Sequence, residues 1–119
     1  MLNNVTAVVC VKNEQDRIEE CLKSIKLNQP LDIIVVDGDS SDDTVKLASK
    51  YTDKIIVSKN SNLTRDRKIG VNAVNTDLIA MIDADHRLDE DSLQKLLIDL
   101  NNGNYDIVQS QLISYKNNN

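Results

Sequence analysis

Two short acidic clusters hold the residues best suited to chemistry, and each follows an apolar, strand-like run. They comprise Asp37, Asp39, Asp42 and Asp43, and then Asp83, Asp85, Asp89, Glu90 and Asp91. The acids at 42–43 and 89–91 fit first helical turns, where negative charge favours the helix dipole. Asp83 and Asp85 instead end the apolar run 77–82. Two such carboxylates can bind one hard cation, Mg²⁺ or Mn²⁺, and a solvated strand end is the alternative.

Three further features could serve a ligand beside that cation. Asp37 closes another apolar run and could accept hydrogen bonds from a ring N–H or a ribose hydroxyl, or it is an ordinary turn residue. Gly38 after it permits a positive φ and close ligand approach. Arg67 belongs to a basic cluster at 65–68 that could meet phosphate oxygens or lie on a solvated helix face. His86, the only histidine, could be a metal ligand or proton shuttle, although a lone loop histidine is more often neither.

Alternating strands and helices must position these side chains. Apolar or β-branched runs predict strands at residues 5–11, 33–36, 54–58, 77–82 and 107–113. Apolar spacing predicts helices at residues 14–26, 42–51, 63–74 and 89–100. Asn13 fits the N-cap of the first helix, and Ser40 or Ser41 fits that of the second, where Ser40 and Asp43 resemble a capping box.

This alternation predicts an α/β fold, in which a mostly parallel, Rossmann-like sheet carries helices on both faces as a three-layer α/β/α structure. Ligands of such sheets bind at the carboxyl ends of the strands, where the strand order reverses. We therefore expect residues 12–14, 37–39 and 83–86 to share one edge.

Composition limits the function classes. The chain has 119 residues and a formal net charge of −5, which fits one domain and argues against a general nucleic-acid-binding protein. No apolar run approaches the ~20 residues of a membrane span, and the N-terminus lacks the basic leader of a signal peptide. Cys10 and Cys21 lack metal-site spacing and fit core positions, which predicts a reduced, cytoplasmic protein.

Three motifs in one order resemble the family 2 glycosyltransferases with the GT-A fold. They are VVCVKNEQDRIEECLKSI, IIVVDGDSSDDTVKLA and TRDRKIGVNAVNTDLIAMIDADHRLDEDSL. The resemblance implies metal-dependent transfer of a sugar from a nucleotide-sugar donor, UDP- or GDP-linked, to an acceptor hydroxyl, with inversion. The acceptor hydroxyl could belong to a saccharide, a lipid or a protein.

The resemblance also assigns residues to the site. Those assigned to the nucleotide are Val11, Asn13, Glu14, Asp37, Arg67, Asp83 and Ala84. Asp37 would pair with the edge of the base, and Asp83 would lie near the ribose. Asp85 would hold the divalent ion, Mg²⁺ or Mn²⁺, that bridges the diphosphate, with Asp83 and His86 as further candidate ligands.

Family members continue well past the motif at 83–85, into a half that supplies most of the acceptor site and the catalytic base. This chain ends at Asn119, so we expect residues 1–119 to be the donor-binding part alone, with no identifiable base. We expect residues 114–119 to form a disordered tail. The apolar run 107–113 could pair with its copy in a second chain, giving a homo-oligomer.

Two other functions fit parts of the pattern. A receiver-like, Mg²⁺-binding signalling domain has a similar length and acidic strand ends. That class places adjacent acids after its first strand, where this sequence has Lys12, Asn13 and Glu14. A catalytically inactive module that retains the nucleotide-binding fold is the second alternative.

Overall fold

The computed structural model describes residues 1–59 and 62–103, which form alternating strands and helices. The elements are β1 (Leu2–Val11), α1 (Ile18–Leu27), β2 (Pro30–Asp37), α2 (Thr44–Ala48), β3 (Ile55–Val57), α3 (Leu63–Asn72), β4 (Leu78–Asp83) and α4 (Ser92–Gly103). The four strands are parallel and lie in the order β3-β2-β1-β4. The order therefore reverses beside β1, because the chain passes from β1 to β3 in one direction and then places β4 on the other side. The strand predicted at 107–113 and the tail predicted at 114–119 lie outside the described residues.

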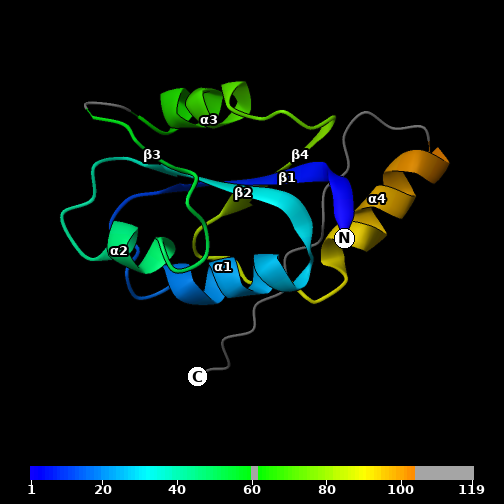
Figure 1. The fold of residues 1–119 in the computed structure, drawn as a ribbon, viewed down its shortest axis with the longest axis horizontal. Helices are drawn as coiled ribbons and strands as arrows, with labels where there is room; N and C mark the ends of the chain where they lie inside the picture. Colours follow the sequence, from blue (N-terminus) through cyan, green and yellow to red (C-terminus); the bar gives the residue numbers. More distant parts are fainter. Residues whose placement is uncertain (60–61, 104–119) are drawn as a thin grey trace.

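Both faces of the central strand are covered. Successive side chains of a strand point to opposite faces, and Ala7, Val9 and Val11 pack into a buried cluster with residues of α1 and α2. Val8 points the other way, into a smaller cluster that Ile69 of α3 covers. Figure 1 shows α1 and α2 on one side of the sheet and α3 on the other. The predicted three-layer α/β architecture is confirmed.

Helix α3 approaches the sheet closely because of one glycine. A Cβ at Gly70 would lie 2.5 Å from Cγ1 of Val8, so a larger residue would push the helix away from β1. Asp66 lies one turn earlier on the same buried face. Since a crossover helix starts at the carboxyl edge of a parallel sheet, this packing brings Asp66 to the edge where the acidic clusters lie.

The predicted N-caps of the first two helices were wrong. Helix α1 begins at Ile18, and Arg17 rather than Asn13 occupies its N-cap position. Asn13 instead has a φ of 52° and uses its side chain to accept a hydrogen bond from the backbone of Ser41. Ser40 does not cap α2, because its hydroxyl donates to Asp37.

The expected placement of acids in first helical turns was also wrong. Helices α2 and α4 have no acidic residue in their first turn, and the acids at 42–43 and 89–91 come just before these helices. In the first case a side-chain hydrogen bond holds the acid outside the helix, because the Asp42 carboxylate accepts from the backbone N–H of Thr44 at 3.0 Å.

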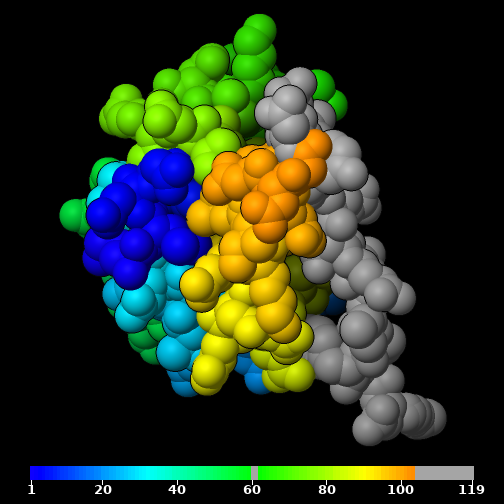
Figure 2. All heavy atoms as spheres, turned by 90° about the vertical axis from the view of Figure 1, so that its right-hand side faces the viewer, coloured from blue at the N-terminus to red at the C-terminus, as the bar shows by residue number. Residues whose placement is uncertain are grey.

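Helix α4 is anchored far from the acidic edge. The backbone N–H of Leu93, the buried residue of α4, donates to the Asn28 side chain at 2.9 Å, and that of Leu88 donates to the Ser24 hydroxyl at 2.9 Å. Ser24 and Asn28 lie at the end of α1, and Figure 2 shows α4 beside the first residues of the chain. None of the helices in the described part is long and apolar enough to cross a membrane.

Strand β4 is buried on one face only. Ile82 packs into the cluster under α1, whereas Ile79 and Met81 on the opposite face are 38% and 46% exposed. Helix α3 packs mainly on β1 and β2, so it leaves this face of β4 uncovered. Strand β1 is therefore buried on both faces, whereas β4 is buried on one.

Candidate functional site

The carboxyl ends of three strands meet at one edge, as the sequence predicted. Val11 pairs with Asp37 across β1 and β2, and Cys10 pairs with Asp83 across β1 and β4. The loops that follow these strands therefore start side by side. They carry the three segments 12–14, 37–39 and 83–86.

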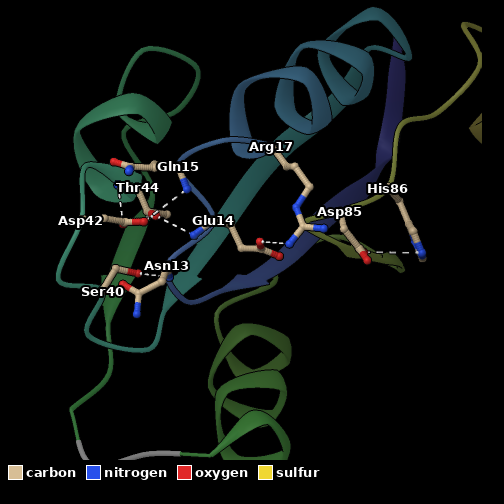
Figure 3. A network of polar contacts seen from close by, with 9 residues as sticks. All are labelled: Asn13, Glu14, Gln15, Arg17, Ser40, Asp42, Thr44, Asp85 and His86. Carbon is tan, nitrogen blue, oxygen red and sulfur yellow. Dashed lines mark hydrogen bonds and ion pairs between the residues drawn. The ribbon is translucent and has the colours of Figure 1, made fainter. Parts of the chain in front are cut away.

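The loops after β1 and β2 are joined by hydrogen bonds through their side chains (Figure 3). The backbone N–H of Asn13 donates to the Ser40 hydroxyl at 2.8 Å, and that of Glu14 donates to the Thr44 hydroxyl at 2.9 Å. In return, the Asn13 side-chain oxygen accepts from the backbone N–H of Ser41 at 2.8 Å. These bonds fix Asn13 and Glu14, two of the residues assigned to the nucleotide, in one position relative to β2.

Two of the four acids of the first cluster accept hydrogen bonds inside this loop. Asp37 is 1% exposed, and its two oxygens accept from the hydroxyl and the backbone N–H of Ser40 at 2.6 and 2.8 Å. Asp42 accepts from the hydroxyl and the backbone N–H of Thr44. The hydroxyl hydrogen bond is the main cause that lowers the pKa of Asp42. These two carboxylates therefore stabilise the loop.

The second cluster presents its carboxylates to solvent. The side chains of Asp83 and Asp85 are 60% and 49% exposed, while Ala84 between them is buried. The backbone N–H of His86 donates to the Asp83 carbonyl at 3.0 Å, which closes a tight turn. Ligand atoms of Asp83, Asp85 and His86 lie within 4.8 Å of one another. Two carboxylate oxygens at this spacing fit the oxygen preference of Mg²⁺ and Mn²⁺.

Basic groups already lie beside these carboxylates. The Arg67 guanidinium is 3.7 Å from an oxygen of Asp83, and the His86 ring is 3.7 Å from an oxygen of Asp85. Both pairs are partly exposed to solvent, so each attraction is weak and can be exchanged for a ligand. Glu14 is bound more closely, since its carboxylate accepts from Arg17 at 2.6 Å.

A cavity of about 350 Å³ opens beside Asp83, on the face of the sheet that carries α3. Its lining consists of Cys10, Arg67, Met81, Ile82 and Asp83. Burial raises the pKa of the Cys10 thiol, and burial raises that of Cys21 to about 12, so both thiols are neutral at physiological pH. The cavity thus combines an apolar wall with one guanidinium and one carboxylate.

Besides Asp37, two apolar residues assigned to the nucleotide are almost fully buried. Val11 and Ala84 are each 4% exposed. The Val11 carbonyl accepts from the backbone N–H of Gly38 at 2.8 Å. Gly38 permits a positive φ but does not adopt one, whereas its neighbour Asp39 has a φ of 68°.

The sequence reasoning missed Asp66, an acid inside the basic cluster. This carboxylate is 6% exposed, and its Oδ2 would lie 3.2 Å from a Cβ at Gly38. Gly38 therefore makes room for Asp66. The available signal was the spacing of four between Asp66 and Gly70, which places both on the helix face that packs on the sheet.

A parallel α/β sheet whose strand order reverses beside β1 defines a doubly wound class of fold, whose ligands bind at this edge. The family model for glycosyl transferase family 2 matches residues 6–119, so this chain belongs to the family 2 glycosyltransferases. An uncharacterized glycosyltransferase of Mycobacterium tuberculosis is 31% identical over 99 residues, which cover 83% of this chain and 44% of that protein. The chain thus spans less than half of this relative, and its membership in the family excludes the receiver-domain alternative.

Two solved structures share the fold. Glucosyl-3-phosphoglycerate synthase from Mycobacterium tuberculosis, in complex with Mn²⁺, UDP and glucosyl-3-phosphoglycerate, has a TM-score of 0.70 at 21% identity, over 82% of this chain and 39% of that one. Mannosyltransferase PcManGT from Pyrobaculum calidifontis, in complex with GDP-Man and Mn²⁺, has a TM-score of 0.73 at 19% identity. The match covers 84% of this chain and 33% of that one. Both are GT-A glycosyltransferases, which confirms the predicted GT-A fold.

Proposed function

We propose that this chain binds a nucleotide-sugar donor, UDP- or GDP-linked, together with Mg²⁺ or Mn²⁺. The observation that carries the proposal is the exposed pair Asp83 and Asp85, which lies with His86 at the switch point of the sheet. The solved relatives bound to Mn²⁺ with UDP or GDP-Man support the same class of ligand.

Asp85 and Asp83 would hold the divalent ion, with His86 as a third ligand. When bound, the ion neutralises negative charge that develops on the leaving nucleoside diphosphate. The His86 N–H closes a turn at 3.0 Å from the Asp83 carbonyl, and ligand atoms of the two carboxylates and His86 lie within 4.8 Å of one another.

The nucleotide would lie across the ends of β1, β2 and β4. The fixed loop that carries Asn13 and Glu14 would border the base, together with the backbone of Val11 and with Asp37. Arg67 lines the cavity beside Asp83. Because its contact with Asp83 is 3.7 Å long and partly exposed, its guanidinium could turn to a phosphate oxygen of the donor.

The relatives of this chain are longer than it is, and we propose sugar transfer for a protein of their length. In that protein an acceptor hydroxyl of a saccharide, a lipid or a protein would attack the anomeric carbon from the face opposite the diphosphate, inverting that centre. The described residues include no carboxylate that we assign as the base for this step. We therefore propose donor binding as the function of the described residues.

Isothermal titration calorimetry with UDP and with GDP tests the proposal directly. We expect saturable binding of at least one nucleotide in Mn²⁺ or Mg²⁺, and a much weaker signal when EDTA removes the metal. Absence of binding for both nucleotides in every metal condition would contradict the proposal. Release of UDP or GDP from sugar donors would then separate an active protein from an inactive nucleotide-binding module.

A further inference from the structure

We infer that Asp66 recognises the base of the donor nucleotide by accepting a hydrogen bond from a ring imino N–H. Uracil N3–H and guanine N1–H are the groups of this kind. The inference rests on the proposed function, because it concerns the nucleotide at the same site. It adds a residue outside the set assigned from the family resemblance.

Asp66 lies at the edge of the sheet where we propose that the base binds. Its Oδ2 would be 3.2 Å from a Cβ at Gly38, and the same Cβ position is 3.5 Å from the Val11 carbonyl and 3.6 Å from Cβ of Lys12. The carboxylate therefore sits over the ends of β1 and β2. Its neighbour in sequence, Arg67, lines the cavity beside Asp83, so α3 connects this carboxylate to the proposed metal site.

The Asp66 carboxylate has unused hydrogen-bonding capacity. The side chain is 6% exposed, and within the described part of the chain its buried Oδ1 has no hydrogen-bond partner. Buried polar atoms in folded proteins are nearly always satisfied, so an exception calls for an explanation. A ligand that donates to this carboxylate explains it, and a small side-chain rotation without movement of the backbone would bring Oδ1 to that ligand.

Asp37 is the other buried carboxylate at this edge, and it is less available. Both of its oxygens accept from Ser40, at 2.6 and 2.8 Å, and it is 1% exposed. A base that took a hydrogen bond from Asp37 would compete with the loop for these oxygens. The same donor at Asp66 meets no such competition at Oδ1.

The chemistry of a carboxylate then limits the base. An ionised carboxylate only accepts hydrogen bonds. Uracil N3 and guanine N1 carry a hydrogen, whereas cytosine N3 and adenine N1 carry a lone pair that a carboxylate repels. Asp66 therefore favours UDP- or GDP-linked donors over CDP- or ADP-linked ones.

The test is Asp66→Asn, which keeps the shape of the side chain and removes its charge. Dissociation constants for UDP, GDP, CDP and ADP are measured by calorimetry in Mn²⁺, for the wild type and the variant. We expect the wild type to prefer UDP or GDP, and the variant to bind that nucleotide about 10- to 100-fold more weakly. CDP affinity should change much less, because an amide can donate to cytosine N3.

Thermal unfolding of the same variant separates recognition from a structural role. Because Asp66→Asn removes a buried, incompletely bonded charge, we expect an unchanged or higher midpoint of the nucleotide-free protein. Asp77→Asn is the matched control, since it removes an exposed carboxylate at the opposite end of β4. It should leave the order of nucleotide affinities as in the wild type.

Two results would overturn the inference while leaving the proposed function intact. In the first, the wild type binds UDP or GDP with metal, and the Asp66→Asn variant binds them with the same affinities and the same preference. The other is a variant with a lower midpoint and an equal loss for all four nucleotides, which would mark Asp66 as structural. A wild type that binds no nucleotide would contradict the proposed function itself, and the inference with it.

Discussion

The acidic loops after β2 and β4 contain the same residue type in opposite roles. After β2, Asp37 is 1% exposed and gives both oxygens to Ser40. After β4, the side chains of Asp83 and Asp85 are 60% and 49% exposed and face basic groups 3.7 Å away. The role of a carboxylate at this edge therefore depends on which hydrogen-bond donors its own loop supplies. The first loop binds its carboxylates internally, and the second exposes them to solvent.

Sequence explains the contrast locally. The first loop contains Ser40, Ser41 and Thr44, whose hydroxyls and backbone N–H groups form hydrogen bonds within the loop or with the loop after β1. The second loop is a short turn in which Ala84 is buried and His86 closes the bend. It has no hydroxyl side chain between Asp83 and His86. Mutations should therefore separate stability from ligand binding.

Asp85→Ala should have the largest effect. We expect it to weaken Mn²⁺-dependent binding of UDP or GDP by at least about 100-fold, since it removes a charged metal ligand. The free energy of unfolding should change by less than about 0.5 kcal/mol, because the side chain is half exposed. Calorimetry and urea denaturation measure the two quantities, with Asp53→Ala as an exposed control near the start of β3. If Asp85→Ala bound UDP or GDP as tightly as the wild type in Mn²⁺, Asp85 would not be a metal ligand.

Asp37→Asn should show the opposite pattern. The amide presents an N–H to a Ser40 donor where the carboxylate presents an oxygen, so the free energy of unfolding should fall by about 1.5–3 kcal/mol. Urea denaturation monitored by circular dichroism measures this loss. If stability stayed at the wild-type value while nucleotide binding disappeared, Asp37 would be a ligand-contacting residue and not a support.

Thr44→Val should cost about 1–2 kcal/mol of stability. The valine fills the same space but leaves the Glu14 N–H, now bonded to the Thr44 hydroxyl at 2.9 Å, without its partner. Thr44→Ser is the matched control because it keeps the hydroxyl, and it should lose less. Equal losses in the two variants would mean that the methyl group, and not the hydrogen bond, stabilises this junction.

The smallest effect is a pH dependence at Asp42. Hydrogen bonds from Thr44 lower the pKa of Asp42 in the folded protein below its unfolded value of about 3.9. The stability that this provides is fully present above the unfolded pKa and is lost as the pH falls through the lowered folded pKa. An NMR titration of the Asp42 carboxyl carbon should show the low pKa, and Thr44→Val should return it toward 3.9. If Asp42 had the same pKa in both proteins, the hydrogen bond from the Thr44 hydroxyl would not be the cause of the lowered pKa.

The fold was largely predictable because its signals are local. Continuous apolar runs such as 5–11 and 33–36 marked the buried strands, and their alternation with helical spacing gave the parallel sheet. The helix starts were harder, since Asn13 and Ser40 are good capping residues that instead bond to partners in another loop. Such long-range partners, 27 residues apart for Asn13 and Ser40, cannot be recognised from local spacing.

The candidate site was predictable where strand ends alone define it. The carboxylates at 83 and 85 needed only the rule that parallel strands end at one edge. The strand-end rule could not identify Asp66. Its position at this edge depends on the absence of a side chain at Gly38 and on the close approach of Gly70 to Val8. Both are tertiary contacts between segments far apart in sequence.

The most direct test of metal binding by Asp83 and Asp85 is an anomalous-scattering map from crystals grown with Mn²⁺ and UDP or GDP. We expect one manganese peak within bonding distance of carboxylate oxygens of Asp85 and Asp83, next to the diphosphate. Manganese bound elsewhere, or a nucleotide seated at this edge with no metal between it and these two aspartates, would contradict it.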